Sequence, residues 1–195
     1  VIMDGDSTMQ MVDPDKNPDF GWGQVLPRFA RDNTKIINLA KGGRSTKSFI
    51  AENRWGQLVD QITSDSWVLI QFGHNDASYK HPERYTAPVD YAENLRKMVA
   101  DVKARSGRPI LITPVVRRYF DNEGKLRDMH GIYPSLVQQV AKETNTPLIE
   151  LFERSASELV SAGAIKTIDW FVHIGPGEHS CCPEGRMDNT HFTEE

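Results

Sequence analysis

One serine near the start of the chain lies in a turn where its hydroxyl could become reactive. An apolar run at residues 1–3 leads directly into the polar sequence GDST, which contains Ser7. A serine acts as a nucleophile when it has a base, a group that orients the base, and donors for the oxyanion that forms. By itself, a serine in such a turn is most often a helix N-cap. The prediction therefore depends on whether the rest of the sequence supplies these partners.

The sequence MDNTHF near the end of the chain supplies a base and an orienting carboxylate. Asp188 and His191 are three residues apart, so on a loop the carboxylate can fold back onto the imidazole. There it fixes the tautomer of the ring and stabilises the imidazolium that forms when the ring takes the serine proton. We predict Ser7, His191 and Asp188 as nucleophile, base and orienting acid, in a site that needs no cofactor.

Donors for the oxyanion are available at three points. They are the backbone N–H of Ser7, the backbone N–H of Gly43 and the side-chain amide of Asn75. Ser7 stands where a following helix would favour negative charge, and Gly43 has no β-carbon to keep a ligand away from the backbone. Asn75 can also be an ordinary turn residue. These three residues form the predicted oxyanion hole.

The elements that position these residues alternate along the chain. Strand-like apolar runs occupy residues 1–3, 35–38 and 67–72 and the sequences RPILITP and TPLIEL. Helical patterns occupy residues 22–31, 56–62, 88–106, 132–144 and 151–161. This alternation predicts a mostly parallel sheet between two helical layers. Because ligands bind at the carboxyl ends of parallel strands, the loops that contain Ser7, Gly43 and Asn75 are expected to meet at one edge.

Taken in order, these blocks resemble those of the SGNH (GDSL-type) hydrolases. The blocks are Gly5-Asp6-Ser7, a glycine in the second loop, the sequence GHND around Asn75, and a terminal Asp-x-x-His. More narrowly, GDSTM, GWGQVL, NLAKGGRSTKSF, IQFGHND and DNTHF are similar to the rhamnogalacturonan acetylesterase family, over nearly the whole chain. The resemblance implies the same roles for Ser7, His191 and Asp188. It also selects Gly43, because the family glycine directly precedes the arginine of GRS.

The resemblance further implies the fold and the reaction. The expected fold is a single α/β domain over residues 1–195, a three-layer α/β/α sandwich with a mostly parallel five-stranded sheet of flavodoxin-like type. Family members continue into a last helix after the histidine, whereas residues 192–195 alone follow it here, so we expect that helix to be lacking. The implied reaction removes O-acetyl groups from pectic rhamnogalacturonan or a related plant cell-wall glycan through a serine acetyl-enzyme.

Four residues are candidates for binding the polysaccharide or oligosaccharide substrate. Arg44, Lys47 and Arg54 place positive charge beside the second loop. They can form a subsite for uronic-acid carboxylates, which arginine pairs bidentately, or they can be a solvated face. Trp170 can stack on a sugar ring, although burial is the commoner fate of a tryptophan.

Two adjacent cysteines close to histidines raise the question of a metal. His173, His179, Cys181 and Cys182 follow no standard zinc spacing, so we predict no metal site. A strained Cys181–Cys182 disulfide is the alternative if the protein is exported.

The composition restricts the class of protein. The chain has 195 residues, 38% of them hydrophobic, and a net charge of −4. Its length suits one globular domain. The charge gives no indication of a nucleic-acid partner, and no apolar run is long enough to span a membrane. A glycan esterase of this kind is expected to be secreted or periplasmic.

Three other functions remain open at this point. An SGNH lipase or thioesterase would act on longer acyl esters, and a comparison of acetyl with octanoyl esters would identify it. A glycan-binding module with a vestigial site would release no acetate, but the intact Ser7, Asp188 and His191 argue against it. A zinc-dependent hydrolase built on the loop from His179 to Cys182 would lose its activity with a chelator.

Overall fold

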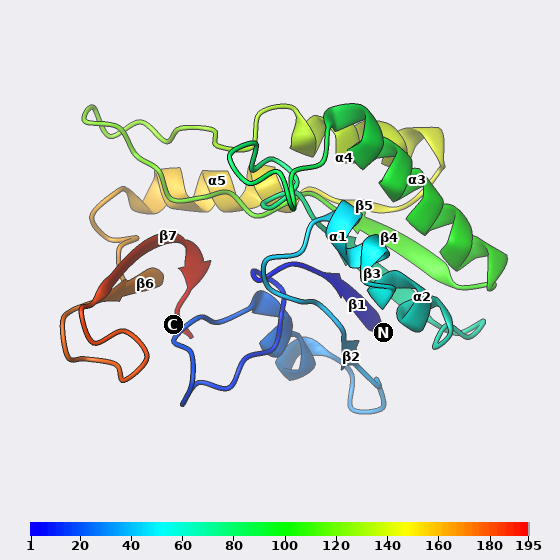
Figure 1. The fold of residues 1–195 in the computed structure, drawn as a ribbon, viewed down its shortest axis with the longest axis horizontal. Helices are drawn as coiled ribbons and strands as arrows, with labels where there is room; N and C mark the ends of the chain where they lie inside the picture. The colour runs from blue at the N-terminus through cyan, green and yellow to red at the C-terminus, as the bar shows by residue number, and fades with distance from the viewer. Residues whose placement is uncertain (195) are drawn as a thin grey trace.

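Five strands form one parallel sheet at the centre of the computed structural model, which describes residues 1–194 (Figure 1). They are β1 (Ile2–Gly5), β2 (Ile37–Asn38), β3 (Trp67–Gln71), β4 (Arg108–Ile112) and β5 (Leu148–Ile149). Their order is β2-β1-β3-β4-β5. In sheets of this flavodoxin-like order, ligands bind beyond the carboxyl ends of β1 and β3, where the strand order reverses. The predicted fold class is confirmed.

The strands are apolar on both sides because both faces of the sheet are covered. Ile2, Val68 and Leu111 belong to one core cluster, while Leu69 and Ile112 belong to another on the opposite face. This arrangement explains why the strands appear in the sequence as continuous apolar runs rather than as alternating patterns.

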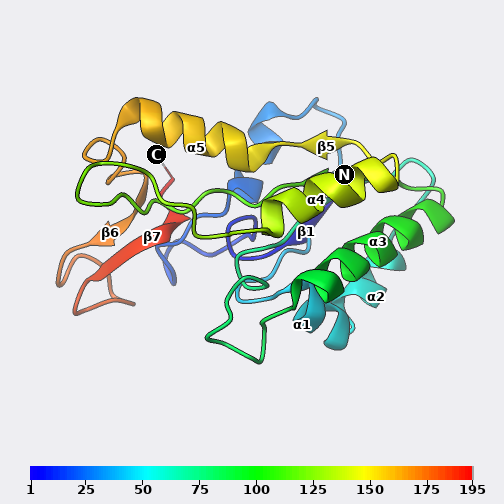
Figure 2. The same ribbon diagram turned by 90° about the horizontal axis from the view of Figure 1, so that it is seen from above.

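Four helices cover the first face of the sheet and form the larger core. They are α1 (Thr46–Ala51), α2 (Arg54–Val59), α3 (Pro88–Ala104) and α4 (Tyr133–Glu143). In Figure 2 they lie on one side of the sheet, and α5 (Leu151–Ala162) lies on the other. Helix α3 begins at Pro88, which suits a first turn, and buries Tyr91, Leu95 and Val102 at helical spacing.

The second face is covered by α5 and by two short 3-10 helices, η1 (Trp22–Gln24) and η2 (Leu26–Phe29). The prediction of one helix over residues 22–31 is therefore wrong. Pro27 lies inside this segment and has no N–H with which to continue a helical ladder. The prediction that a last helix is lacking stays a prediction.

This second face also contains a space that we call the apolar hollow. It is lined by Trp22, Leu26, Leu69, Ile112, Val115, Ile149, Leu151 and Phe192 and has a volume of about 400 Å³.

The end of the chain forms an antiparallel hairpin of β6 (Phe171–Ile174) and β7 (Arg186–Phe192). The sequence interpretation places Asp188 and His191 on a loop, and the structure corrects this, because both lie on β7. Strand β7 is difficult to recognise because its sequence RMDNTHF is mostly polar. Within residues 1–194, no helix is both long and apolar enough to cross a membrane.

Candidate active site

Ser7, His191 and Asp188 form a continuous hydrogen-bonded series. The Nε2 atom of His191 lies 2.8 Å from the Oγ atom of Ser7. The Nδ1 atom of the same ring lies 2.7 Å from the Oδ2 atom of Asp188. With the proton on Nδ1, the imidazole donates to the carboxylate and keeps Nε2 free to accept the serine proton. The structure thus brings together two residues that are separated by most of the chain.

Strand β7 holds the carboxylate and the imidazole in place. The Oδ1 atom of Asp188 accepts hydrogen bonds from the backbone N–H groups of Thr190, at 2.7 Å, and His191, at 3.1 Å. The backbone N–H of Phe20 donates to the carbonyl of Phe192 at 2.9 Å, which ties β7 to the segment that follows β1. His191 therefore reaches Ser7 from a strand supported on both sides.

An arginine that the sequence interpretation missed contacts the same carboxylate. Arg186 donates to the Oδ2 atom of Asp188 and forms an ion pair, at 2.7 Å, with the Oδ1 atom of Asp19. Its guanidinium also lies 3.2 Å from the Nδ1 atom of His191. The contact between Arg186 and Asp188 could have been predicted from their spacing, because residues two apart share one face of a strand. The contact between Arg186 and Asp19 could not, because these residues are far apart in the sequence.

These contacts fix the charge on Asp188. Burial alone would raise the pKa of this carboxyl. The hydrogen bond and the charge of His191, with the backbone N–H groups of His191 and Thr190, instead hold the pKa well below its usual range. For Arg186, burial lowers the pKa, but the hydrogen bond to Asp188 and the charge of Asp19 raise it. Asp188 is therefore an ionised acceptor that orients the imidazole.

The turn that carries Ser7 is locked by the residue before it. Asp6 is fully buried, and its Oδ1 atom accepts from the backbone N–H of Thr8 at 3.0 Å and from the Thr8 hydroxyl at 2.9 Å. Its Oδ2 atom lies 3.1 Å from the Nδ1 atom of His74. Burial raises the pKa of Asp6, but the charge and hydrogen bond of His74 and the bonds from Thr8 lower it overall. Asp6 and His74 therefore position the nucleophile turn.

The three predicted oxyanion donors lie on loops that are tied to one another. Among the hydrogen bonds of residues 1–194, none uses the backbone N–H of Ser7 or Gly43. The Asn75 amide donates to the carbonyl of Arg44 at 3.0 Å, and this bond uses one of its two N–H groups. Gly43 has φ of +76°, a conformation that favours glycine. The loops after β1, β2 and β3 thus present unused donors at one sheet edge.

The predicted substrate-binding cations have partners on the protein itself. Arg44 and Arg54 both donate to Glu52, at 3.1 and 2.6 Å. Lys47 donates to the carbonyl of Pro82 at 3.2 Å. Trp170 is partly buried against the apolar cluster of α5 and the terminal hairpin, so its ring packs on hydrophobic side chains.

The cysteines are free thiols, with sulfur atoms 3.0 Å apart. The disulfide considered as an alternative is not formed. Within the described part of the chain, the one group of three ligand-type side chains close enough to hold a metal ion is Asp19, Asp188 and His191. The guanidinium of Arg186 already sits on both carboxylates of this group, so a cation does not fit there.

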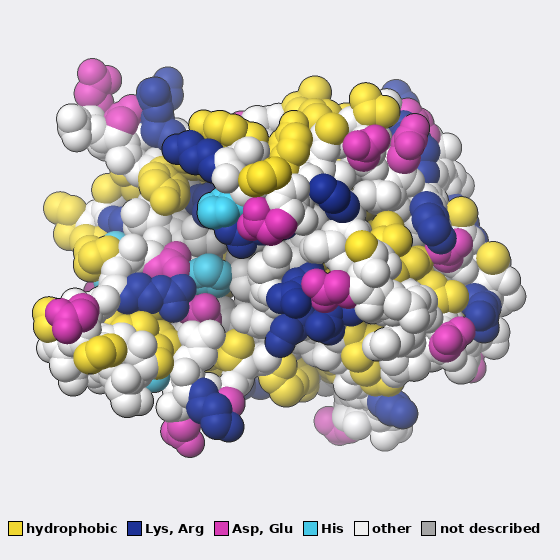
Figure 3. Space-filling view, viewed as in Figure 1, with side chains coloured by type: hydrophobic (Ala, Val, Ile, Leu, Met, Phe, Trp, Pro, Cys, Tyr) yellow, Lys and Arg dark blue, Asp and Glu magenta, His cyan; other side chains and the backbone are white. Residues whose placement is uncertain are grey.

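The His191 side chain is 21% exposed and Ser7 is 9% exposed, so the imidazole side of the site reaches the surface. On the face of the molecule seen in Figure 3, His side chains are visible with acidic and basic side chains beside them. A serine, an imidazole, an ionised carboxylate and free N–H donors on such a surface can carry out acyl transfer.

Comparison with known proteins shows relatives over the whole chain. The sequence profile of the GDSL-like lipase/acylhydrolase family matches residues 5–194. The chain is 37% identical over 195 residues to the probable rhamnogalacturonan acetylesterase YesY of Bacillus subtilis, covering 100% of this chain and 85% of that protein. It is 36% identical over 195 residues to the rhamnogalacturonan acetylesterase RhgT of Bacillus subtilis, covering 100% of this chain and 82% of that protein.

Solved structures share the fold. The protein YxiM of Bacillus subtilis superposes with a TM-score of 0.80 and 27% identity over 98% of this chain. This chain spans 51% of that one, or about half its length. A catalytic mutant of the acetylxylan esterase Axe2 from Geobacillus stearothermophilus superposes with a TM-score of 0.61 and 21% identity, over 80% of this chain and 78% of that one.

Proposed function

The chain belongs to the GDSL-like lipase/acylhydrolase family and is a serine esterase, and from this premise we propose that it removes O-acetyl groups from a plant cell-wall polysaccharide. The two relatives that match over the whole chain are named rhamnogalacturonan acetylesterases, so an acetylated pectic glycan is the proposed substrate class. The observation that carries the proposed chemistry is the 2.8 Å contact between Ser7 and His191.

In the first half of the proposed reaction, the Oγ atom of Ser7 attacks the acetyl carbonyl carbon while its proton passes to the Nε2 atom of His191. The oxyanion is stabilised by the N–H groups of Ser7, Gly43 and Asn75. When the tetrahedral intermediate collapses, the bond to the sugar oxygen breaks and His191 returns the proton to that oxygen. The products are a free sugar hydroxyl and an acetyl group on Ser7.

In the second half, a water molecule attacks the acetyl carbonyl and gives its proton to His191. The bond to Ser7 then breaks, and His191 returns the proton to the Ser7 oxygen as acetate leaves. Asp188 stays ionised throughout and stabilises the imidazolium in both halves.

The direct test is acetate release from a panel of substrates. Purified enzyme is incubated with acetylated rhamnogalacturonan, acetylated xylan and small sugar acetates, with Ser7→Ala as the control. We expect the fastest release from acetylated rhamnogalacturonan and none with the variant. Hydrolysis of aryl acetates without acetate release from any glycan would contradict the proposal.

A second candidate is hydrolysis of longer acyl esters, and one observation favours it. The apolar hollow includes Phe192, the residue next to His191, and has a volume of about 400 Å³, enough for an alkyl chain. Comparing kcat/KM for acetyl and octanoyl esters of one alcohol decides between the two. The acetylesterase proposal requires a higher kcat/KM for the acetyl ester. A higher kcat/KM for the octanoyl ester would favour an esterase for longer acyl chains instead.

Location outside the cytoplasm is part of the same proposal, because an intact cell-wall polysaccharide is too large to enter the cell and reach a cytoplasmic enzyme. Fractionation of the native host should place the acetylesterase activity in the culture medium or the periplasm. Activity confined to the cytoplasmic fraction would contradict it.

A further inference from the structure

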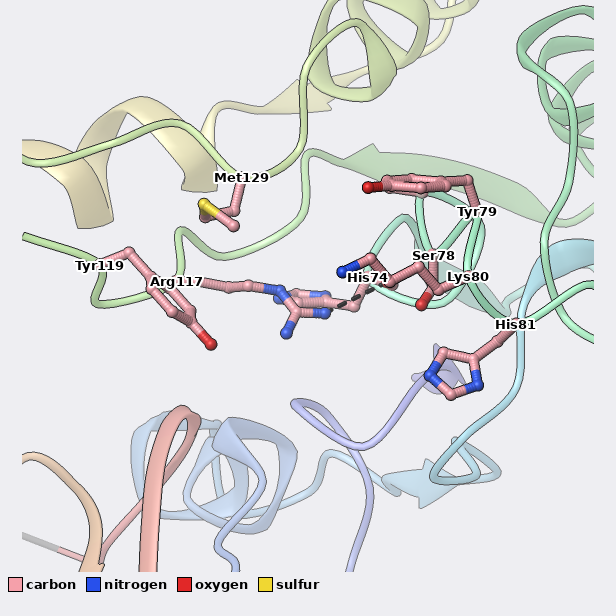
Figure 4. Close-up of a pocket in the computed structure, with 9 residues that line it drawn as sticks. His74, Ser78, Tyr79, Lys80, His81, Arg117, Tyr119 and Met129 are labelled. Carbon is pink, nitrogen blue, oxygen red and sulfur yellow. Dashed lines mark hydrogen bonds between the residues drawn. The ribbon is translucent and has the colours of Figure 1, made fainter.

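A cavity of about 240 Å³ is formed by two loops that also contact residues adjacent to Ser7 and His191. The loop after β3 contributes His74 and Lys80, and the loop between β4 and α4 contributes Arg117 and Tyr119. Figure 4 shows these side chains around a common space. Its volume is slightly below the roughly 300–1,000 Å³ of most small-molecule sites, which suits one sugar unit rather than an oligomer.

Two contacts connect the cavity with the proposed catalytic residues. Arg117 donates to the hydroxyl of Thr190, at 2.7 Å, and Thr190 directly precedes His191. His74, which also lines the cavity, lies 3.1 Å from Asp6, the residue before Ser7. A polymer that presents an acetyl group to Ser7 can therefore place a neighbouring unit in the cavity.

The cavity is lined by two cationic side chains, Arg117 and Lys80, and the charges of Asp6 and Asp188 act on Arg117 from outside its lining. Arg117 is partly buried, and its hydrogen bonds go to two uncharged acceptors, the Thr190 hydroxyl and the backbone carbonyl of His74. Lys80 lies over the ring of Tyr79 at 6.0 Å. None of the residues that line the cavity is a carboxylate. A guanidinium held in this way can pair with an incoming anion, and a carboxylate matches its planar geometry.

The walls suit a sugar ring as well as an anion. Tyr79 is 72% exposed and Tyr119 is 39% exposed, so both rings are open to a ligand. Aromatic rings of this kind offer an apolar face together with a hydroxyl. Cationic and aromatic groups together favour a carboxylated sugar over a neutral sugar or a simple inorganic anion.

We propose that this cavity is a subsite for a uronic-acid unit next to the acetylated sugar, with Arg117 pairing with the uronate carboxylate and Lys80 adding charge at its entrance. The proposal rests on the proposed function and assigns recognition of the uronate in its pectic substrate to residues of this cavity. It also moves the carboxylate subsite away from Arg44 and Arg54, because Glu52 already occupies those two guanidinium groups.

The test compares one acetylated oligosaccharide in two forms, with its uronate carboxylates free or methyl-esterified. For the wild-type enzyme, kcat/KM for acetate release should be roughly tenfold higher with the free acid, the size expected for a hydrogen bond to a charged group. In Arg117→Gln this ratio should fall to near one, and in Lys80→Gln it should fall part of the way. Because each ratio is taken within one variant, a general loss of activity cancels.

Arg44→Gln is the matched control, since it removes a guanidinium that already has a carboxylate partner. Its ratio should equal that of the wild type. A wild-type ratio near one would overturn the subsite. So would a ratio that survives in both Arg117→Gln and Lys80→Gln, or one that collapses in Arg44→Gln instead.

A binding measurement separates failure of the subsite from failure of the proposed function. Calorimetry with Ser7→Ala and an unacetylated uronate oligomer should give a Kd roughly tenfold lower than with its methyl ester. If acetate release fails on every glycan but this difference is found, the subsite stands and the esterase substrate is wrong. Equal affinities would overturn the subsite whatever the activity.

Discussion

Asp188 accepts hydrogen bonds from the imidazole of His191, from two backbone N–H groups and from Arg186. Replacing it with asparagine keeps the shape of the side chain but removes the charge that stabilises the imidazolium. We expect Asp188→Asn to lower kcat by roughly 10²–10⁴-fold with little change in KM. Steady-state kinetics on an aryl acetate measure this. An unchanged kcat would remove Asp188 from the proposed mechanism.

Gly43 tests the oxyanion hole through the backbone. With φ of +76°, it has a conformation in which an alanine is strained, although a β-carbon there would meet nothing within 4 Å. Gly43→Ala should cost about 1 kcal/mol of stability and lower kcat by roughly 10²-fold as the donor turns away. Thermal unfolding and aryl acetate kinetics measure the two effects.

Gly124 provides a matched control for this change. It has the same φ of +76° and the same open surroundings, but it lies in a turn of the loop between β4 and α4. Gly124→Ala should therefore lower the melting temperature by a similar amount and leave kcat unchanged. Equal kinetic losses in the two variants would contradict the role of Gly43.

At the scale of elements, the turn after β1 depends on one buried contact between a carboxylate and an imidazole. Asp6 and His74 join the loops after β1 and β3 at 3.1 Å, with both side chains almost fully buried. Asp6→Asn removes the charge that accepts the hydrogen bonds from Thr8 and His74 and should lower the free energy of unfolding by about 2 kcal/mol, the size of a hydrogen bond to a charged group. Urea denaturation measures the loss. Asp60→Asn makes the same chemical change in the exposed pair with Arg105, and it should have no measurable effect.

The elements that the sequence predicts best are those with a strong apolar pattern. Helix α3, expected over residues 88–106, spans Pro88–Ala104, and the apolar run at residues 67–72 contains β3. The hairpin of β6 and β7 was missed because β7 is polar and is held by pairing with β6 rather than by an apolar face of its own. Pairing partners far apart in the sequence leave no local pattern.

The same reasoning applies to the residues of the site. Blocks such as GDST and DNTHF identify Ser7 and His191 because their chemistry lies in short motifs. Arg117 was missed because its importance comes from its position beside Thr190, and nothing near it in the sequence indicates that contact. Contacts between distant loops can be identified once the sheet has brought the loops together.

At the scale of the whole molecule, a buried acid links stability to pH. Asp76 is fully buried, and burial raises its pKa to about 7 against the hydrogen bonds from Thr46. In the unfolded chain its pKa is about 3.9. Between these two values the folded state binds the Asp76 proton more tightly than the unfolded chain does. The stability that this proton contributes is therefore complete below about pH 4 and is lost as the pH rises through 7.

The variant Asp76→Asn removes this titration. Relative to the wild type, it should gain about 3 kcal/mol of stability between pH 5 and pH 8. Urea denaturation of both proteins at the two pH values measures the gain. A difference in stability that does not change with pH would show that Asp76 is ionised in the folded protein across this range. Asp4, also buried and with a pKa raised well above its usual value by burial, contributes with the same sign.

The claim on which every other step depends is that Ser7 carries the acetyl group between sugar and water. The most direct measurement is peptide mapping by mass spectrometry after a reaction with an aryl acetate is quenched in acid. We predict one acetyl group on the peptide that contains Ser7, and no acetylation of that peptide in Ser7→Ala. An acetyl group on another residue, or full turnover by Ser7→Ala, would contradict the claim.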